Sequence, residues 1–142
     1  MLVDLEKIRR FFAADRFAAS NGIVIDQVSE DEVVCSFRIT PDHLNAGGNV
    51  QGGAIFTLAD LAFAVHCNLR LALGEEVGLT VGQSCAISFF KPPRGNRLLA
   101  RSHCLSHGRH VSVYRISVLD EEGRLIAEMQ GNGFTTPRPV QA

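Results

Sequence analysis

The segment from His43 to Asn68 constrains the fold more than any other, because a glycine-rich loop runs there into a long apolar helix. The helix is predicted to begin at the paired glycines Gly52 and Gly53, and its apolar interior contains one acid, Asp60. The first N–H groups of a helix lack intrahelical partners and carry partial positive charge, and glycine lets a ligand approach them closely. The segment therefore predicts an oxyanion-binding helix start, followed by a carboxylate that must be paired or functional.

The spacing of these features indicates an oligomer. Asp60 follows Gly52 by eight residues, which at about 1.5 Å per residue corresponds to about 12 Å along the helix. An aspartate side chain cannot reach back over that distance. If both features serve one reaction, they come from two subunits of a symmetric assembly, with the site at the interface.

Composition limits the class of protein. A chain of 142 residues suits one domain, and a net charge of −1 with both signs interspersed argues against a nucleic-acid partner. Residues 54–73 are mostly apolar, but Asp60, His66 and Arg70 interrupt them, which favours a core helix over a membrane span. The first residues lack the basic and apolar pattern of a secretory signal, so none is expected. The scattered cysteines, predicted to be small buried side chains, suit a reducing, cytoplasmic compartment; they are Cys35, Cys67, Cys85 and Cys104.

The apolar periodicity predicts an α+β domain spanning residues 1–142. An N-terminal helix within residues 1–20 would be capped by Asp4, the long helix would run from about Gly53 to Leu73, and residues 137–142 would form a loose tail. The predicted strands are antiparallel and hairpin-linked, and the long helix needs their face to lie against. They cover residues 23–28, 32–39, 77–90, 98–105, 110–119 and 124–134, with Val81, Gln83, Cys85, Ile87 and Phe89 sharing one face.

The motif Asn45-x-x-Gly48-x-x-Gln51-Gly52-Gly53, followed by Thr57-Leu58-Ala59-Asp60, resembles the hotdog-fold acyl-CoA thioesterases, and within them the phenylacetate-pathway (PaaI-type) branch. The similarity extends through Phe89-Phe90-Lys91-Pro92 and covers roughly residues 21–136. One departure is plain, because these enzymes usually have His-Gly-Gly where this chain has Gln51-Gly52-Gly53.

The resemblance implies a hotdog fold, in which an antiparallel sheet wraps around one long central helix. It also implies hydrolysis of an acyl-CoA, of aryl (phenylacetyl) type or medium chain length, to a free acid and coenzyme A. No separate cofactor is expected, since coenzyme A is part of the substrate. The implied active unit is a homodimer, assembled further into a tetramer as a dimer of dimers, with no nucleic-acid or membrane partner.

Four residues are candidate catalytic groups. Asp60 would be the nucleophile on the thioester carbonyl or the general base for water, and the sequence does not choose between these roles. The N–H of Gly53 would hold the developing oxyanion. Gln51 can donate a hydrogen bond or orient water but cannot shuttle protons. Asn45 would position the nucleophile or water, or would merely stabilise a local turn.

Six further residues are candidate substrate-binding groups. Gly52 and Gly48 shape the loop and helix start, although such glycines can also simply permit close packing. Thr57 could hydrogen-bond Asp60 or its own helix backbone. Gly108, Arg109 and Arg94 are in basic turns that could contact the phosphates of coenzyme A, or could be solvated surface.

Other polar residues are assigned no chemistry. His66 and Asn68 are predicted to be core or interface groups, and the spacing of His103, His107 and His110 does not resemble a metal ligand set. Two rival functions share the fold: a non-catalytic acyl-CoA-binding protein, which Asp60 argues against, and a 3-hydroxyacyl dehydratase, which Gln51 in the usual histidine place weakens.

Overall fold

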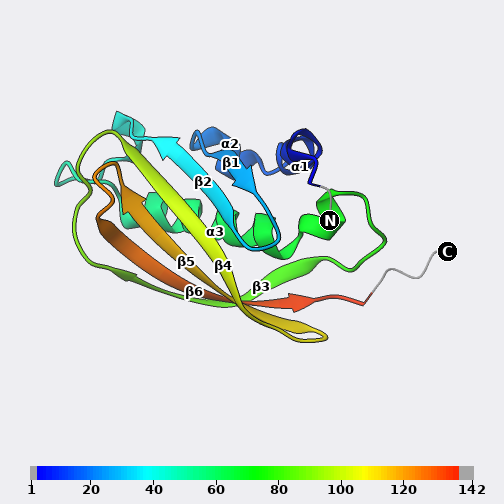
Figure 1. Cartoon of the computed structure of the whole chain (residues 1–142). Coiled ribbons are helices and arrows are strands. Elements are labelled where there is room, and N and C mark those ends of the chain that lie inside the picture. The colour runs from blue at the N-terminus through cyan, green and yellow to red at the C-terminus, as the bar shows by residue number, and fades with distance from the viewer. Residues whose placement is uncertain (1–2, 138–142) are drawn as a thin grey trace.

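The computed structural model describes residues 3–137 and shows a six-stranded antiparallel sheet wrapped around helix α3 (Gly52–Cys67) (Figure 1). The predicted architecture of a sheet around one central helix is confirmed. The strand order is β1-β2-β4-β5-β6-β3. The strands are β1 (Val24–Val28), β2 (Val33–Arg38), β3 (Thr80–Phe89), β4 (Arg97–His107), β5 (Val111–Asp120) and β6 (Leu125–Thr135).

Helix α3 lies close against the sheet because small residues face it. The ring of Phe63 is 2% exposed and packs over Gly131 of β6, where a Cβ would lie 3.2 Å from two ring carbons. A larger residue at position 131 would push the helix away from the sheet. The buried side chains of α3 are apolar apart from one histidine, and they are Ile55, Leu58, Ala59, Leu61, Ala62, Phe63, Val65 and His66.

The N-terminal helix predicted within residues 1–20 is two helices, α1 (Leu5–Phe12) and α2 (Arg16–Ser20). Asp4 caps the first as predicted, its carboxylate accepting from the N–H of Lys7 at 3.1 Å. Asp15 starts the second in the same way, accepting from Ala18 at 3.0 Å. The prediction missed this second cap and so merged the two helices. The predicted tail at 137–142 lies outside the described residues, apart from Pro137.

The central helix is shorter than predicted. It ends at Cys67, and a separate short helix, α4 (Leu69–Ala72), follows in place of continuation to Leu73. The cause is Asn68, whose amide oxygen accepts from the N–H of Thr80 at 2.8 Å while its amide nitrogen donates to the carbonyl of Thr80 at 2.9 Å. This pairing fixes the start of β3 against the end of α3. Among residues 3–137, no helix is both long enough and apolar enough to cross a membrane.

Strand β3 forms one edge of the sheet, and nearly all of its residues are exposed. A register irregularity between Gly82 and Ser84 breaks the predicted alternation. Strict alternation would place Gly82 on the face opposite Cys85 and Ile87. Because of the irregularity, Gly82 instead faces Phe63 of α3, on the same side of β3 as Cys85 and Ile87. Strand β4 continues to His107, inside the predicted turn.

Strand β1 forms the opposite edge, and a side chain covers it. The guanidinium of Arg9, on α1, donates from Nε and Nη2 to the carbonyl of Ile25 at 3.0 and 2.8 Å. That carbonyl adjoins an irregularity in β1 between Ile25 and Gln27. At Ile25 the β1 edge is therefore occupied by a side chain, whereas nearly all residues of the β3 edge are exposed.

Candidate active site

The paired glycines lie at the start of α3, where the sequence predicts an oxyanion site. Gln51 is the N-cap residue, and its side-chain oxygen accepts the N–H of Gly53. Gly52 packs against an aromatic ring of β3, since a Cβ at this position would lie 3.3 Å from Cζ of Phe89. Close packing thus accounts for Gly52, and the Gly53 N–H is held by Gln51.

The loop before the helix is held together by Asn45. Its side-chain oxygen accepts from the N–H of Gly47 at 2.9 Å and of Asn49 at 3.2 Å. Gly48 has φ of 81°, a left-handed conformation that favours glycine. Of the two roles considered for Asn45, the turn-stabilising one has direct support in these contacts. The side chain of Thr57 likewise bonds its own helix, donating to the carbonyl of Gly53 at 2.7 Å.

Asp60 lies on the face of α3 that the sheet leaves uncovered. The residue is exposed, and within the described chain its carboxylate has no hydrogen bond or ion pair. The atoms packed around the carboxylate raise the pKa of Asp60 above the ordinary 3.8, and the negative charge of Asp15 raises it further. The thiols of Cys67 and Cys85 are close enough to Asp60 for its charge to act on them. An unpaired carboxylate with a raised pKa is typical of a functional acid or base.

The helix start and Asp60 are well separated in one chain. Gly53 and Asp60 are seven residues apart on an unbroken helix, which is about 10 Å. The single chain therefore does not bring these two candidate groups together.

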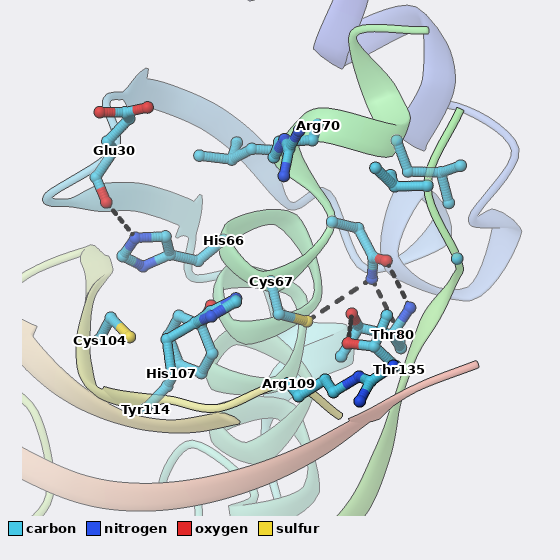
Figure 2. A pocket seen from close by; sticks show the side chains of 15 residues that line it. Glu30, His66, Cys67, Arg70, Thr80, Cys104, His107, Arg109, Tyr114 and Thr135 are labelled. Carbon is cyan, nitrogen blue, oxygen red and sulfur yellow. Dashed lines mark hydrogen bonds between the residues drawn. The ribbon is translucent and has the colours of Figure 1, made fainter. Parts of the chain in front are cut away.

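A pocket of about 350 Å³ lies at the C-terminal end of α3, bounded by α4, the start of β3 and the β4–β5 hairpin (Figure 2). One of its lining residues is Cys67, which follows Asp60 by seven residues on α3. The side chains of two lining residues, His107 and Arg109, have no hydrogen bond or ion pair in the described chain. Gly108, between them, closes the hairpin by donating its N–H to the carbonyl of Val111 at 2.8 Å.

The second candidate arginine lies elsewhere. Arg94 is in the β3–β4 loop, where its N–H donates to Asp120 at 3.0 Å and its guanidinium contacts Glu122 at 3.4 Å. Arg109 closely precedes β5 and Asp120 ends it, so ten residues of strand, about 33 Å, separate the two arginines. Within one chain they do not form a common site.

Two of the histidines, His66 and His103, make structural contacts. His66 is 5% exposed and joins α3 to two other segments, through Ser102 Oγ at 3.0 Å and the carbonyl of Glu30 at 2.8 Å. Burial lowers the pKa of His66, although these hydrogen bonds oppose the shift. His103 contacts the carboxylate of Glu32 at 2.7 Å. Across residues 3–137, no group of three or more His, Cys, Asp or Glu side chains is arranged to hold a metal ion.

Only some of the cysteines match the expectation of small buried side chains. Cys35 is buried and Cys67 is partly buried, but Cys85 and Cys104 are exposed in the single chain. Burial raises the pKa of the Cys67 thiol to about 12. The sequence reasoning also missed Asp15, whose charge acts on Asp60. An aspartate directly before Arg16-Phe17-Ala18 is a recognisable helix cap, but nothing in the sequence indicates its proximity to Asp60.

Comparisons with known proteins agree with the fold. The thioesterase superfamily matches residues 47–127, which include both the helix start and Asp60. A curated relative, the acyl-coenzyme A thioesterase PaaI of Escherichia coli, is 31% identical over 118 residues, covering 80% of this chain and 79% of its own.

Two solved structures extend the comparison. The TT0310 protein of Thermus thermophilus is 32% identical with a TM-score of 0.76, covering 86% of this chain and 98% of its own. The E. coli PaaI protein from the phenylacetic acid degradation operon is 25% identical with a TM-score of 0.83, covering 96% and 99%. The chain therefore belongs to the thioesterase superfamily, as a PaaI-type thioester hydrolase with the hotdog fold.

Proposed function

We propose that the protein hydrolyses an acyl-CoA to a free carboxylic acid and coenzyme A, at sites formed between two subunits. The observation that carries this proposal is Asp60, an unpaired carboxylate with a raised pKa on the uncovered face of the central helix. The name of the E. coli relative, an acyl-coenzyme A thioesterase, supports the same substrate class.

The bare β3 edge supports a homodimer. An exposed strand of ten residues presents unpaired backbone groups that invite a second strand. Antiparallel pairing of two β3 strands about a two-fold axis would set the uncovered faces of two α3 helices against each other, running in opposite directions. Asp60 of one subunit would then meet the helix start of the other. A tetramer made of two such dimers is the larger assembly that we expect, in a reducing cytoplasm that keeps the thiols free.

In the proposed reaction the thioester oxygen accepts a hydrogen bond from the N–H of Gly53. Because the side-chain oxygen of Gln51 accepts a hydrogen bond from that N–H, the Gln51 side chain must first rotate away. Its NH₂ group could then donate a hydrogen bond to the substrate. Asp60 of the partner either attacks the carbonyl carbon, giving a mixed anhydride that water cleaves, or removes a proton from the attacking water. In both routes the carbon–sulfur bond breaks, and the thiolate of coenzyme A leaves and is protonated.

Coenzyme A would occupy the 350 Å³ pocket. His107 and Arg109 supply unpaired basic groups for its phosphates, and the backbone at Gly108 keeps the hairpin tight beside them. Arg94 could contribute only from another subunit, since it lies at the far end of the sheet. Asn45, Gly48, Gly52 and Thr57 would act by shaping the loop and helix start around Gly53.

The test is a thiol-release assay with a panel of acyl-CoA esters, including phenylacetyl-CoA and medium-chain esters, on the wild type and Asp60→Asn. We expect turnover by the wild type that Asp60→Asn loses. Tight binding of every ester without release of thiol would instead favour the non-catalytic acyl-CoA-binding function.

A further inference from the structure

His43 begins the glycine-rich segment but takes no part in the proposed chemistry. It ends the short 3₁₀ helix η1 (Pro41–His43) and is buried, with 5% of its surface exposed. Its ring stacks on that of Phe37, in β2, with the ring centres 4.2 Å apart. A buried imidazole is stable when both of its nitrogens have hydrogen-bond partners, and in His43 both do.

The two ring nitrogens of His43 bind backbone groups of different segments. Nδ1 accepts from the N–H of Thr40 at 3.0 Å, and the Thr40 hydroxyl lies 3.3 Å from the same nitrogen. Because Nδ1 accepts, Nε2 carries the proton and donates to the carbonyl of Asn21 at 2.8 Å. Asn21 is the C-cap residue of α2. The imidazole therefore joins η1 to the N-terminal helices.

The backbone of His43 closes the loop that precedes the central helix. Its carbonyl accepts from the N–H of Gln51 at 2.8 Å, and a β-bridge lies just inside this contact. Residues 43–51 thus form a closed loop, which we call the glycine loop. Gln51 is also the N-cap residue of α3 and accepts the N–H of Gly53. A displacement of His43 would therefore pass through Gln51 to the N–H that is proposed to bind the oxyanion.

We propose that His43 is a positioning residue, which anchors the glycine loop to α2 and so fixes Gln51 and the N–H of Gly53 for the reaction. The side chain of Asn45 bonds N–H groups of the loop itself, so those contacts shape the loop without attaching it to α2. Oxyanion donors are effective when they are held in place before the reaction. This inference rests on the proposed function for the reaction that the loop serves.

Three substitutions separate the contacts of the ring. His43→Gln keeps a nitrogen donor as far from Cα as Nε2, which can reach the Asn21 carbonyl, but it lacks the acceptor for Thr40. His43→Asn keeps an acceptor near the place of Nδ1, but its side chain is too short to reach Asn21. His43→Phe keeps a ring against Phe37 and loses both hydrogen bonds.

The kinetic test measures thiol release at a temperature at which circular dichroism shows every variant to be folded. We expect His43→Phe and His43→Asn to lower kcat by about 10–10²-fold and to leave KM within about twofold, because the oxyanion donor is displaced while coenzyme A still binds. His43→Gln should keep kcat within about threefold of the wild type, since it retains the bond to Asn21.

Arg9→Met is the matched control, because it removes another hydrogen bond from a side chain to a backbone carbonyl, that of Ile25. We expect it to have wild-type kinetics. A loss of kcat in Arg9→Met or in His43→Gln as large as that in His43→Phe would overturn the proposal.

Hydrogen exchange of the loop amides, followed by NMR, separates this inference from the proposed function. We expect the N–H groups of Gly47 and Gln51 to exchange at least about tenfold faster in His43→Phe than in the wild type, and at the wild-type rate in Arg9→Met. That result would support the anchor even if no ester were hydrolysed, and only the proposed function would then fail. Wild-type exchange in His43→Phe would overturn the anchor, whatever the turnover.

Discussion

At the scale of single residues, Asp60 has opposite effects on activity and stability. We expect Asp60→Asn to lower kcat by about 10²–10⁴-fold, the usual contribution of a positioned acid or base. The wild-type rate should stay level through neutral pH and fall in acid as Asp60 gains a proton, at a pH above the ordinary pKa of 3.8. Initial rates across the pH range check both statements. A histidine-like inflection near neutrality would contradict them.

The same substitution should stabilise the fold. Because the folded-state pKa of Asp60 is raised, ionisation costs the folded chain more than the unfolded chain. That cost is absent below the unfolded pKa of about 3.9, where both states are protonated, and it is complete above the folded pKa. We expect Asp60→Asn to raise Tm at pH 7 and to leave it unchanged in strong acid. A lower Tm at pH 7 would show that Asp60 has a stabilising partner.

A substitution at Gln51 should also change activity and stability in opposite directions. Gln51→Glu keeps the shape of the cap but places a negative charge on the N–H of Gly53. The charged cap binds the helix start more strongly and should raise Tm, yet it repels the developing oxyanion and should lower kcat/KM by about tenfold or more. Gln51→His serves as the matched control, and we expect it to retain activity. Wild-type kinetics in the glutamate variant would mean that the thioester oxygen does not use this N–H.

At the scale of elements, Asn68 joins helix to sheet. Asn68→Ala leaves the buried N–H and carbonyl of Thr80 without their side-chain partners. We expect the free energy of unfolding to fall by about 2–4 kcal/mol, measured by urea denaturation. Asn96→Ala, at an exposed turn, is the control and should change it by less than about 0.5 kcal/mol. A neutral Asn68→Ala would mean that α3 ends for another reason.

The contact between Asn68 and Thr80 also shows which parts of the fold the sequence could predict. The apolar periodicity of α3 and the alternation of the strands are local signals, and they predicted the sheet around a helix correctly. The end of α3 depends on a pairing between Asn68 and Thr80, twelve residues apart, and no local pattern contains it. The irregularity at Gly82 and Ser84 is set in the same way, by register with β6.

The candidate site likewise combines local sequence signals with contacts that no local pattern contains. The glycine pair has the local signature of a helix start, and Asp60 has that of an acid within an apolar helix. The capping of Gly53 by Gln51, the approach of Asp15 to Asp60 and the turn made by Asn45 depend on side-chain direction, which the sequence does not fix. The pocket at the end of α3 arises from elements far apart in the chain, so no motif marks it.

At the scale of the whole molecule, the proposed sharing of each site between two subunits predicts rescue between inactive variants. Asp60→Asn and Gly53→Val each damage one half of every site, so mixed dimers should contain one site with both halves intact. We expect jointly refolded mixtures to recover up to about a quarter of the wild-type activity, the statistical yield of intact sites for random pairing. Separately refolded, then combined samples are the control. Mixed dimers verified by mass spectrometry but devoid of activity would locate the whole site in one chain.

The capping of β1 by Arg9 has a consequence for growth of the assembly. A sheet with two bare edges could add subunits without limit and form a filament, as open-ended contacts do. Because Arg9 occupies the Ile25 carbonyl on one edge, a strand that adds there must first displace this guanidinium, whereas addition at the β3 edge requires no such displacement. We therefore expect this guanidinium to disfavour open-ended growth of the sheet from the β1 edge.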